Sequence, residues 1–127
     1  MEYPTHLKYT KDHEWAQVEA NQVTVGITDH AQSALGDIVY VELPKVGRTL
    51  KAGETFGVVE SIKAVSDLYS PITGKVTAVN DALVGNPAKL NHDPHGSAWL
   101  IKMELTDPAS AASLLDVAAY SKLVANT

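Results

Sequence analysis

Residues 57–68, with the sequence GVVESIKAVSDL, decide the fold that we expect for this chain. Valines before and after residues 61–64 favour extended backbone, so the stretch predicts two short β-strands joined by a tight turn with Lys63 at its tip. Turns selected for folding alone usually contain Asn-Gly or Asp-Gly, whereas this turn places Ile62 beside the lysine. An exposed apolar side chain indicates recognition by another protein. On the residues alone, Lys63 is either a site of covalent modification or an ordinary solvated lysine.

The sequence outside this hairpin predicts further strands. β-branched and aromatic residues are enriched in short runs that are separated by Gly, Pro and Asn. We expect these runs to form strands at 13–19, 23–27, 38–42, 75–80 and 99–105. Residues 43–48, 51–54 and 70–74 are expected to form loops or turns between them.

Helix signals are few and lie mostly near the C-terminus. Thr28 or Asp29 is expected to cap a short helix that ends at Gly36. One helical turn is expected near residues 88–90, and a helical stretch is expected from Pro108 to Leu115. A last helix, capped by Asp116, would place its apolar side chains on one side. These elements together predict a mainly β protein with short helices.

The composition is typical of a soluble globular protein. Of 127 residues, 45% are hydrophobic and 20% are charged, and this length suits one domain spanning residues 1–127. No apolar run approaches the roughly 18 residues that a membrane span requires. Residues 1–6 lack the features of a secretory or transit peptide. We therefore expect a cytoplasmic protein, or one of the mitochondrial matrix if a presequence has been removed, and no membrane partner.

Charge and cysteine content exclude several functions. The formal net charge is −5, from 15 acidic and 10 basic residues, so a nucleic-acid partner is not expected. The absence of cysteine excludes disulfide bonds, thiolate metal sites and cysteine nucleophiles. Any redox chemistry must therefore be imported from outside the chain.

No arrangement typical of a catalytic site is present. The sequence lacks a Gly-x-Ser-x-Gly elbow, a Walker-type loop and a Rossmann glycine motif. The adjacent pairs at residues 13–14 and 29–30 make poor cooperating pairs, because neighbours on a strand face opposite ways. Residues 92–95, which begin and end with histidine, favour a surface loop over a metal site. We expect a protein that is not an enzyme and has no bound metal.

Residues 59–67 resemble the lipoyl-attachment hairpin of the glycine cleavage system H protein family. The resemblance continues along nearly the whole chain, and the occurrence of the segments in this order over this length makes it specific. The matching segments are residues 8–9, 13–15, 25–32, 35–37, 41–44, 70–74, Val79-Asn80 with Leu83, Asn91 with Pro94, and residues 113–116 with Tyr120.

The resemblance implies both a fold and a cofactor. Members of this family fold as a flattened hybrid of barrel and sandwich, mainly β, with short helices and a helical C-terminus. Lipoic acid would be joined through an amide to the ε-nitrogen of Lys63, and the attachment hairpin would consist of Glu60, Ser61, Ile62 and Ala64 around it. The lipoyl disulfide would supply the redox chemistry that a cysteine-free chain lacks.

The function implied by the resemblance is that of a carrier. In the family, the arm receives the aminomethyl group of glycine at the P protein, a glycine decarboxylase, and delivers it to the T protein, an aminomethyltransferase. The L protein, dihydrolipoyl dehydrogenase, then reoxidises the arm. A lipoate ligase, or a lipoyl or octanoyl transferase, would attach the arm, and we expect the carrier to be a monomer.

The resemblance also implies a cleft that shelters the loaded arm from water. It places Glu14, His30 and Asp67 in that cleft. Carboxylates there would favour the loaded arm, which carries a cationic amine. Each residue also has a plainer interpretation: Glu14 as a solvated strand residue, His30 as a first-turn helix residue, and Asp67 as a charge that stabilises the hairpin.

Other interpretations of the lysine remain open. Biotin carriers usually have methionine on both sides of the lysine and dehydrogenase lipoyl domains usually have aspartate before it, whereas this chain has Ile62 and Ala64. An H-like protein that relays lipoyl groups to other enzymes would have the same hairpin. An unmodified scaffold or a weak enzyme would be revealed by its intact mass.

Overall fold

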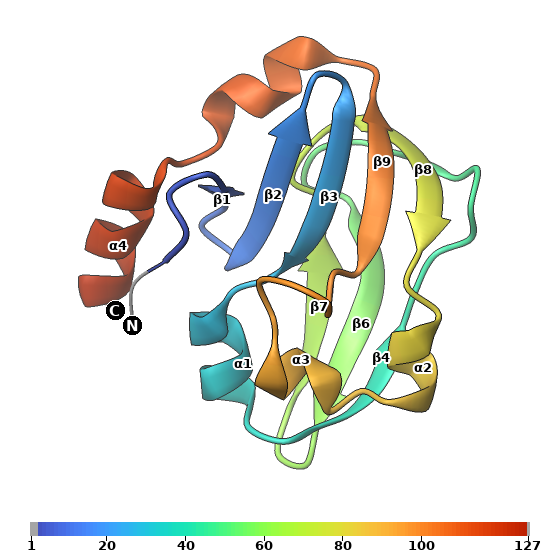
Figure 1. Ribbon diagram of the computed structural model, residues 1–127, viewed down its shortest axis with the longest axis vertical. Helices are drawn as coiled ribbons and strands as arrows, with labels where there is room; N and C mark the ends of the chain where they lie inside the picture. The colour runs from blue at the N-terminus through green and yellow to red at the C-terminus, as the bar shows by residue number, and fades with distance from the viewer. Residues whose placement is uncertain (1–2, 127) are drawn as a thin grey trace.

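The computed structural model describes residues 3–126, and it consists of two antiparallel sheets with short helices at their margins (Figure 1). The larger sheet has the order β1 (Lys8–Tyr9), β2 (Glu14–Glu19), β3 (Gln22–Ile27), β9 (Ile101–Leu105), β8 (Gly74–Val79), β5 (Thr49–Leu50). The smaller sheet has the order β4 (Ile38–Glu42), β6 (Thr55–Ser61), β7 (Val65–Tyr69). The two sheets do not close into a barrel. The expected mainly β fold is confirmed.

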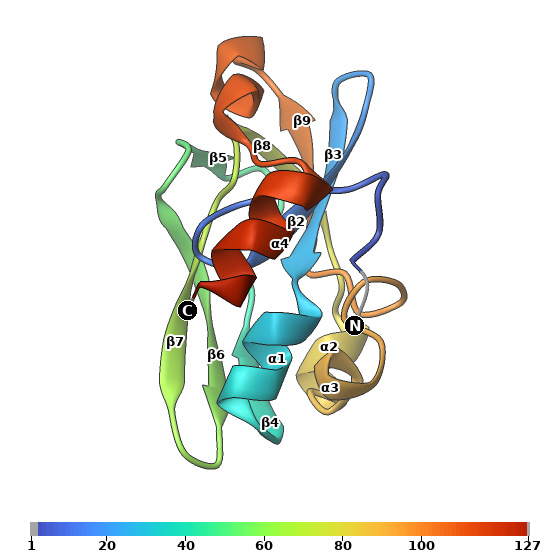
Figure 2. The ribbon, with the colours of Figure 1, turned by 90° about the vertical axis from the view of Figure 1, so that its left-hand side faces the viewer.

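The helices lie at the margins of the sheets. They are α1 (Asp29–Leu35), α2 (Ala82–Gly85), α3 (Lys89–His92), the 3₁₀ helix η1 (Pro108–Ser113) and α4 (Val117–Ala125). Helices α1, α2 and α3 lie near the same end of the molecule as the β6–β7 turn, whereas η1 lies at the opposite end (Figures 1 and 2). In the part of the chain that the structure describes, no helix is long and apolar enough to cross a membrane.

The core lies between the two sheets. Alternate residues of the strands point inward, so the smaller sheet contributes Val41, Val59 and Leu68, and the larger sheet contributes Val25 and Met103, among others. A second apolar cluster joins the first strand to the last helix. Its buried members are Leu7, Tyr9, Trp15 and Tyr120. These two clusters fix the positions of the β6–β7 hairpin and of α4.

The expected helix caps are confirmed. The Thr28 side chain accepts a hydrogen bond from the Ala31 N–H and begins α1, and Gly36 ends α1 with a φ of 80°. Asp116 accepts a bond from the Ala119 N–H and begins α4. Local side-chain chemistry thus sets these helix ends.

Several expectations need correction. The stretch 108–113 is a 3₁₀ helix, and Leu114 is already extended. The last strand begins at Ile101, two residues later than expected. Strands β1 and β5 and helix α2 were not expected from the sequence. The two strands have two residues each and form because they pair with β2 and β8. The local sequence does not indicate this pairing.

Candidate functional site

The turn that carries Lys63 is closed by Ser61. The Ser61 N–H donates to the Ala64 carbonyl at 2.8 Å, and the Ser61 hydroxyl oxygen accepts from the N–H groups of Lys63 at 3.3 Å and Ala64 at 3.1 Å. A serine side chain therefore satisfies backbone donors in a turn that has no glycine. This explains how the tip stays tight without the usual Asn-Gly pair.

Lys63 itself is exposed, and among the described residues it has no ion-pair partner. The side-chain salt bridge found in residues 3–126 joins Arg48 to Glu54, not Lys63 to a carboxylate. On one side the lysine chain passes close to Gly36, where an added Cβ would lie 3.5 Å from the lysine Cε. The exposed residue is therefore accessible for covalent attachment, and the Cε next to its amine lies close to the end of α1.

An apolar and acidic surface surrounds the lysine. Ile62 is 72% exposed, as expected from the sequence, and Val65 is 66% exposed. In the outer face of the small sheet, Tyr40, Glu60 and Val65 lie opposite one another in register. The next row consists of Glu42, Val58 and Asp67. Asp67 is thus an exposed residue of this outer face.

A pocket of about 320 Å³ lies beside the other end of strand β7. Its wall combines the loop before β2, the turn at residues 52–53, the end of β7 and the segment after η1. The lining residues are Thr10, Lys11, Asp12, Glu14, Ala52, Gly53, Tyr69, Ser70, Pro71, Ser113, Leu114 and Leu115. The pocket therefore depends on four segments that are far apart in the sequence.

Glu14 is the buried charged group of this pocket, with 2% of its surface exposed. One carboxylate oxygen accepts from the Thr10 hydroxyl at 2.7 Å, and the other accepts from the Tyr69 N–H at 3.3 Å. Burial raises the pKa of Glu14 to about 7, and these two hydrogen bonds act in the opposite direction. Near neutral pH the carboxyl group is thus divided between its protonated and its ionised form.

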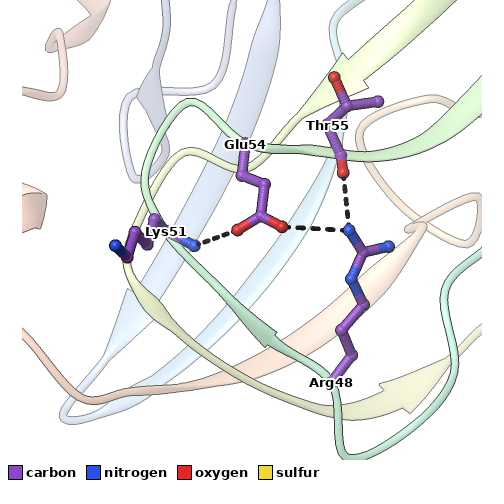
Figure 3. A network of polar contacts seen from close by, with 4 residues as sticks. All are labelled: Arg48, Lys51, Glu54 and Thr55. Atoms are coloured by element: carbon purple, nitrogen blue, oxygen red, sulfur yellow. Dashed lines mark hydrogen bonds and ion pairs between the residues drawn. The ribbon is translucent and has the colours of Figure 1, made fainter.

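The turn that forms one wall of the pocket is held by a small polar network (Figure 3). Glu54 accepts from the Lys51 N–H at 3.0 Å and from the Arg48 guanidinium at 3.2 Å. The same guanidinium nitrogen donates to the Thr55 carbonyl at 3.1 Å. These contacts fix the backbone of residues 51–54 and therefore the position of the wall.

His30 lies elsewhere, in a cluster between α1, β2 and α4. Its ring centroid is 4.5 Å from that of His13, and the His13 Nδ1 is 2.8 Å from the Tyr120 hydroxyl. That hydroxyl also contacts the Thr28 hydroxyl at 2.7 Å. Burial, with a smaller contribution from the charge of His30, lowers the pKa of His13. Within residues 3–126, no three His, Asp or Glu side chains gather as a metal site would require.

The three cleft residues named from the resemblance thus lie in three places. Glu14 lines the pocket, Asp67 lies on the outer face of the small sheet, and His30 belongs to the histidine cluster. Their common role remains a prediction. Sequence reasoning missed Thr10 and Tyr69, which bind the Glu14 carboxylate. No local signal identifies them, because the contact between Glu14 and β7 joins the two sheets.

Comparison with known proteins identifies the family. A model of the family described as glycine cleavage H-protein matches residues 7–127. The glycine cleavage system H protein of Myxococcus xanthus is 56% identical over 124 residues, covering 98% of this chain and 96% of that protein. The corresponding protein of Bacteroides thetaiotaomicron is 52% identical over 124 residues, covering 98% of each.

A solved structure gives the same result. The crystal structure of a glycine cleavage system H protein from Mycobacterium marinum matches with a TM-score of 0.90 and 42% identity. The match covers 97% of this chain and 99% of that one. With its two open sheets, its exposed hairpin lysine and these relatives, the chain belongs to the glycine cleavage H-protein family.

Proposed function

We propose that residues 1–127 form one lipoyl-carrier domain and that Lys63 carries lipoic acid in an amide bond. On that arm the protein carries the aminomethyl group of glycine from the P protein to the T protein, and the L protein restores the arm. The observation that carries this proposal is an exposed Lys63 on a closed hairpin, with no ion pair to any residue from 3 to 126, in a member of this family. The protein itself has no catalytic role in the proposal.

The residues around Lys63 fit a lipoyl amide. Acylation removes the charge of the amine, and the amine has no ion-pair partner among the described residues that would lose an interaction. The neighbours Ile62 and Val65 are exposed and apolar, so they suit contact with an aliphatic arm. Gly36 leaves space beside the lysine side chain. When bound, the lipoyl group supplies a disulfide for redox chemistry.

Strand β7 leads from the lysine to the pocket. Its five residues, Val65–Tyr69, span about 17 Å at about 3.3 Å per residue. An arm of about ten single bonds, each about 1.5 Å long, has a contour length of about 15 Å, to which the lysine side chain adds its own length. The far end of an arm laid along β7 would therefore reach the neighbourhood of Glu14.

In this proposal Glu14 favours a cationic cargo. A pKa of about 7 means that a positive charge nearby would shift the carboxyl group toward its ionised form. The surrounding Leu114, Leu115 and Pro71 would limit the access of water to the end of the arm. The pocket is then a holding site between visits to partner enzymes.

The outer face of the small sheet is the surface that the partners would meet first. It combines exposed Ile62, Val65 and Tyr40 with Glu60 and Asp67. We propose that the enzyme that attaches the arm, a lipoate ligase or a lipoyl or octanoyl transferase, docks here, because it must reach the Lys63 amine.

The test combines intact mass with activity. After expression with lipoate, the intact mass should increase by one lipoyl group, and peptide mapping should locate it on Lys63. The modified protein should then support exchange of bicarbonate with the carboxyl group of glycine when a P protein is added. An unmodified mass under these conditions would overturn the proposal. A modified protein that supports no exchange, yet donates its lipoyl group to another enzyme, would indicate a relay instead.

A further inference from the structure

The side chain of Asn91, on α3, spans the connection between α1 and β4. Its amide oxygen accepts from the Ile38 N–H at 2.9 Å. Its amide nitrogen donates to the Gly36 carbonyl at 2.8 Å and to the Gln32 side-chain oxygen at 3.0 Å. One side chain therefore binds the backbone on both sides of Asp37.

The connection that Asn91 holds is also the one that contacts the lysine turn. The Ile62 N–H donates to the Asp37 carbonyl at 3.1 Å, and Ile38 is paired with Ser61 at the start of the β4–β6 ladder. Figures 1 and 2 show the α1–β4 connection passing next to the tip of the β6–β7 hairpin. Holding residues 36–38 thus holds the acceptor of a hydrogen bond donated by the residue before Lys63.

Gly36, in the same connection, lies beside the lysine side chain. With a φ of 80°, it has a backbone conformation that side-chain-bearing residues rarely adopt. The lysine Cε lies where it would be 3.5 Å from a Cβ at this position. The carbonyl of Gly36 is also an acceptor for Asn91. Asn91 thus binds the carbonyl of a residue whose open Cβ side faces the lysine side chain.

We propose that Asn91 is a positioning residue for Lys63. By fixing residues 36–38, it keeps the turn in the single orientation that an attaching enzyme binds. Without it, the connection has several accessible conformations, the Ile62–Asp37 bond opens more often, and a smaller fraction of molecules presents the lysine correctly. The apparent affinity of the enzyme falls in proportion to that fraction. This enzymatic consequence rests on the proposed attachment of lipoate to Lys63.

The experiment compares Asn91→Ala with the wild-type protein by two measurements. Amide hydrogen exchange should be at least about tenfold faster at Ile62 in the variant, while exchange in β3 and β9 changes much less. With a lipoate ligase and free lipoate, the KM for the variant should rise by about five- to tenfold with little change in kcat. A purely structural role would accelerate exchange throughout the sheets and leave the KM of the folded fraction unchanged.

Two further variants make the result specific. Asn80→Ala is the matched control, because the Asn80 side chain donates to the carbonyls of Ser97 and Trp99 and does not contact the connection at residues 36–38. It should leave the Ile62 exchange rate and the KM unchanged. Asn91→Asp keeps the acceptor for Ile38 but places a carboxylate oxygen against the Gly36 carbonyl, so it should accelerate Ile62 exchange and raise the KM at least as much as alanine does, and it remains informative if the alanine variant does not fold.

The outcomes separate this inference from the proposed function. Wild-type KM and Ile62 exchange in both Asn91 variants would overturn the inference while leaving lipoylation intact. Failure of the wild-type protein to accept lipoate would overturn the proposed function, and the Ile62 exchange data would still decide whether Asn91 holds the turn.

Discussion

The two ends of strand β7 differ in almost every physical respect. At one end, Val65 is 66% exposed, and Lys63, two residues before it, is also exposed. At the other end, the Tyr69 N–H donates to the carboxylate of Glu14, a residue with 2% of its surface exposed. The exposed end is suited to transfer between proteins, and the buried end is suited to retention. A single strand of five residues therefore connects the proposed attachment site to the proposed holding site.

The two ends are also stabilised differently. The lysine turn is held by hydrogen bonds from Ser61 and to Asp37, which open easily because they lie near solvent. The pocket end is held by packing and contains a charge whose burial costs free energy. Mutations at the turn should therefore change recognition with little effect on stability, and mutations at the pocket should do the reverse.

Replacing the lysine is expected to have the largest effect, at the exposed end. Lys63→Arg keeps the charge but offers no amine for an amide bond, so lipoyl attachment and support of glycine decarboxylation should be lost completely. The melting temperature should stay within about 1 °C, because the side chain is exposed and has no ion pair within residues 3–126. Intact mass and thermal unfolding check both points. A lipoylated Lys63→Arg protein would show that another residue accepts the arm.

At the buried end, Glu14→Gln tests the free-energy cost of burying an ionised carboxylate. Because the folded pKa is raised to about 7 from 4.5, the Glu14 contribution to stability is fully present below pH 4.5 and is lost as the pH rises through 7. The stability of the wild type relative to Glu14→Gln should therefore fall by about 3 kcal/mol between pH 4 and pH 8. Urea unfolding at both pH values measures this difference.

The control for this measurement lies on the same strand. Glu19→Gln, at the exposed far end of β2, should show a difference from wild type that does not change with pH by more than about 0.5 kcal/mol. A flat difference for Glu14→Gln as well would mean that the carboxylate is solvated and that the contrast between the two ends is wrong.

A smaller effect is expected from the partner of Glu14. Thr10→Val removes the hydroxyl that donates to Glu14 and accepts from the Asp12 N–H at 3.2 Å. The protein should lose about 1–2 kcal/mol of stability, and the pKa of Glu14 should rise, because a bond to its ionised form is lost. Carbon-13 NMR titration of the Glu14 carboxyl group follows the pKa. Thr77→Val, exposed on β8, is the control and should change neither quantity.

The smallest effect on stability is expected from Ile62→Ser at the turn. The side chain is 72% exposed, so the free energy of unfolding should change by less than about 0.5 kcal/mol. The KM of a lipoate ligase should nevertheless rise severalfold if the apolar tip is a contact. Val46→Ser, which is 60% exposed in a loop, serves as the control and should leave the KM unchanged. Equal KM values for both variants would remove Ile62 from the recognised surface.

The elements that could be predicted from the sequence are those whose ends or strand pattern depend on neighbouring residues. The ends of α1 and α4 followed from Thr28 and Asp116, and the predicted strand at 38–42 coincides with β4. Strands β1 and β5 could not be predicted, because each has two residues and depends on a partner that is distant in the chain.

The residues of the candidate site also fall into two groups, those that a local pattern predicts and those that depend on long-range packing. Lys63 and exposed Ile62 were predictable, because a turn between two valine-rich strands is a local feature. The pocket was not, because Glu14 meets Tyr69 only when the two sheets pack. The position of Asp67 on the outer face depends on the register between β6 and β7, which the composition of the strands does not specify.

The bridge between Tyr9 and Leu115 has a consequence for the time course of synthesis. The two residues exchange backbone hydrogen bonds of 2.8 and 2.7 Å, and Leu115 lines the pocket. The roughly 50 residues from Lys63 to Leu115 take about 3–10 seconds to translate at about 5–20 residues per second. During that interval a nascent chain has its lysine but lacks the last wall of the pocket. An arm attached before release from the ribosome would therefore lack the holding site that we propose.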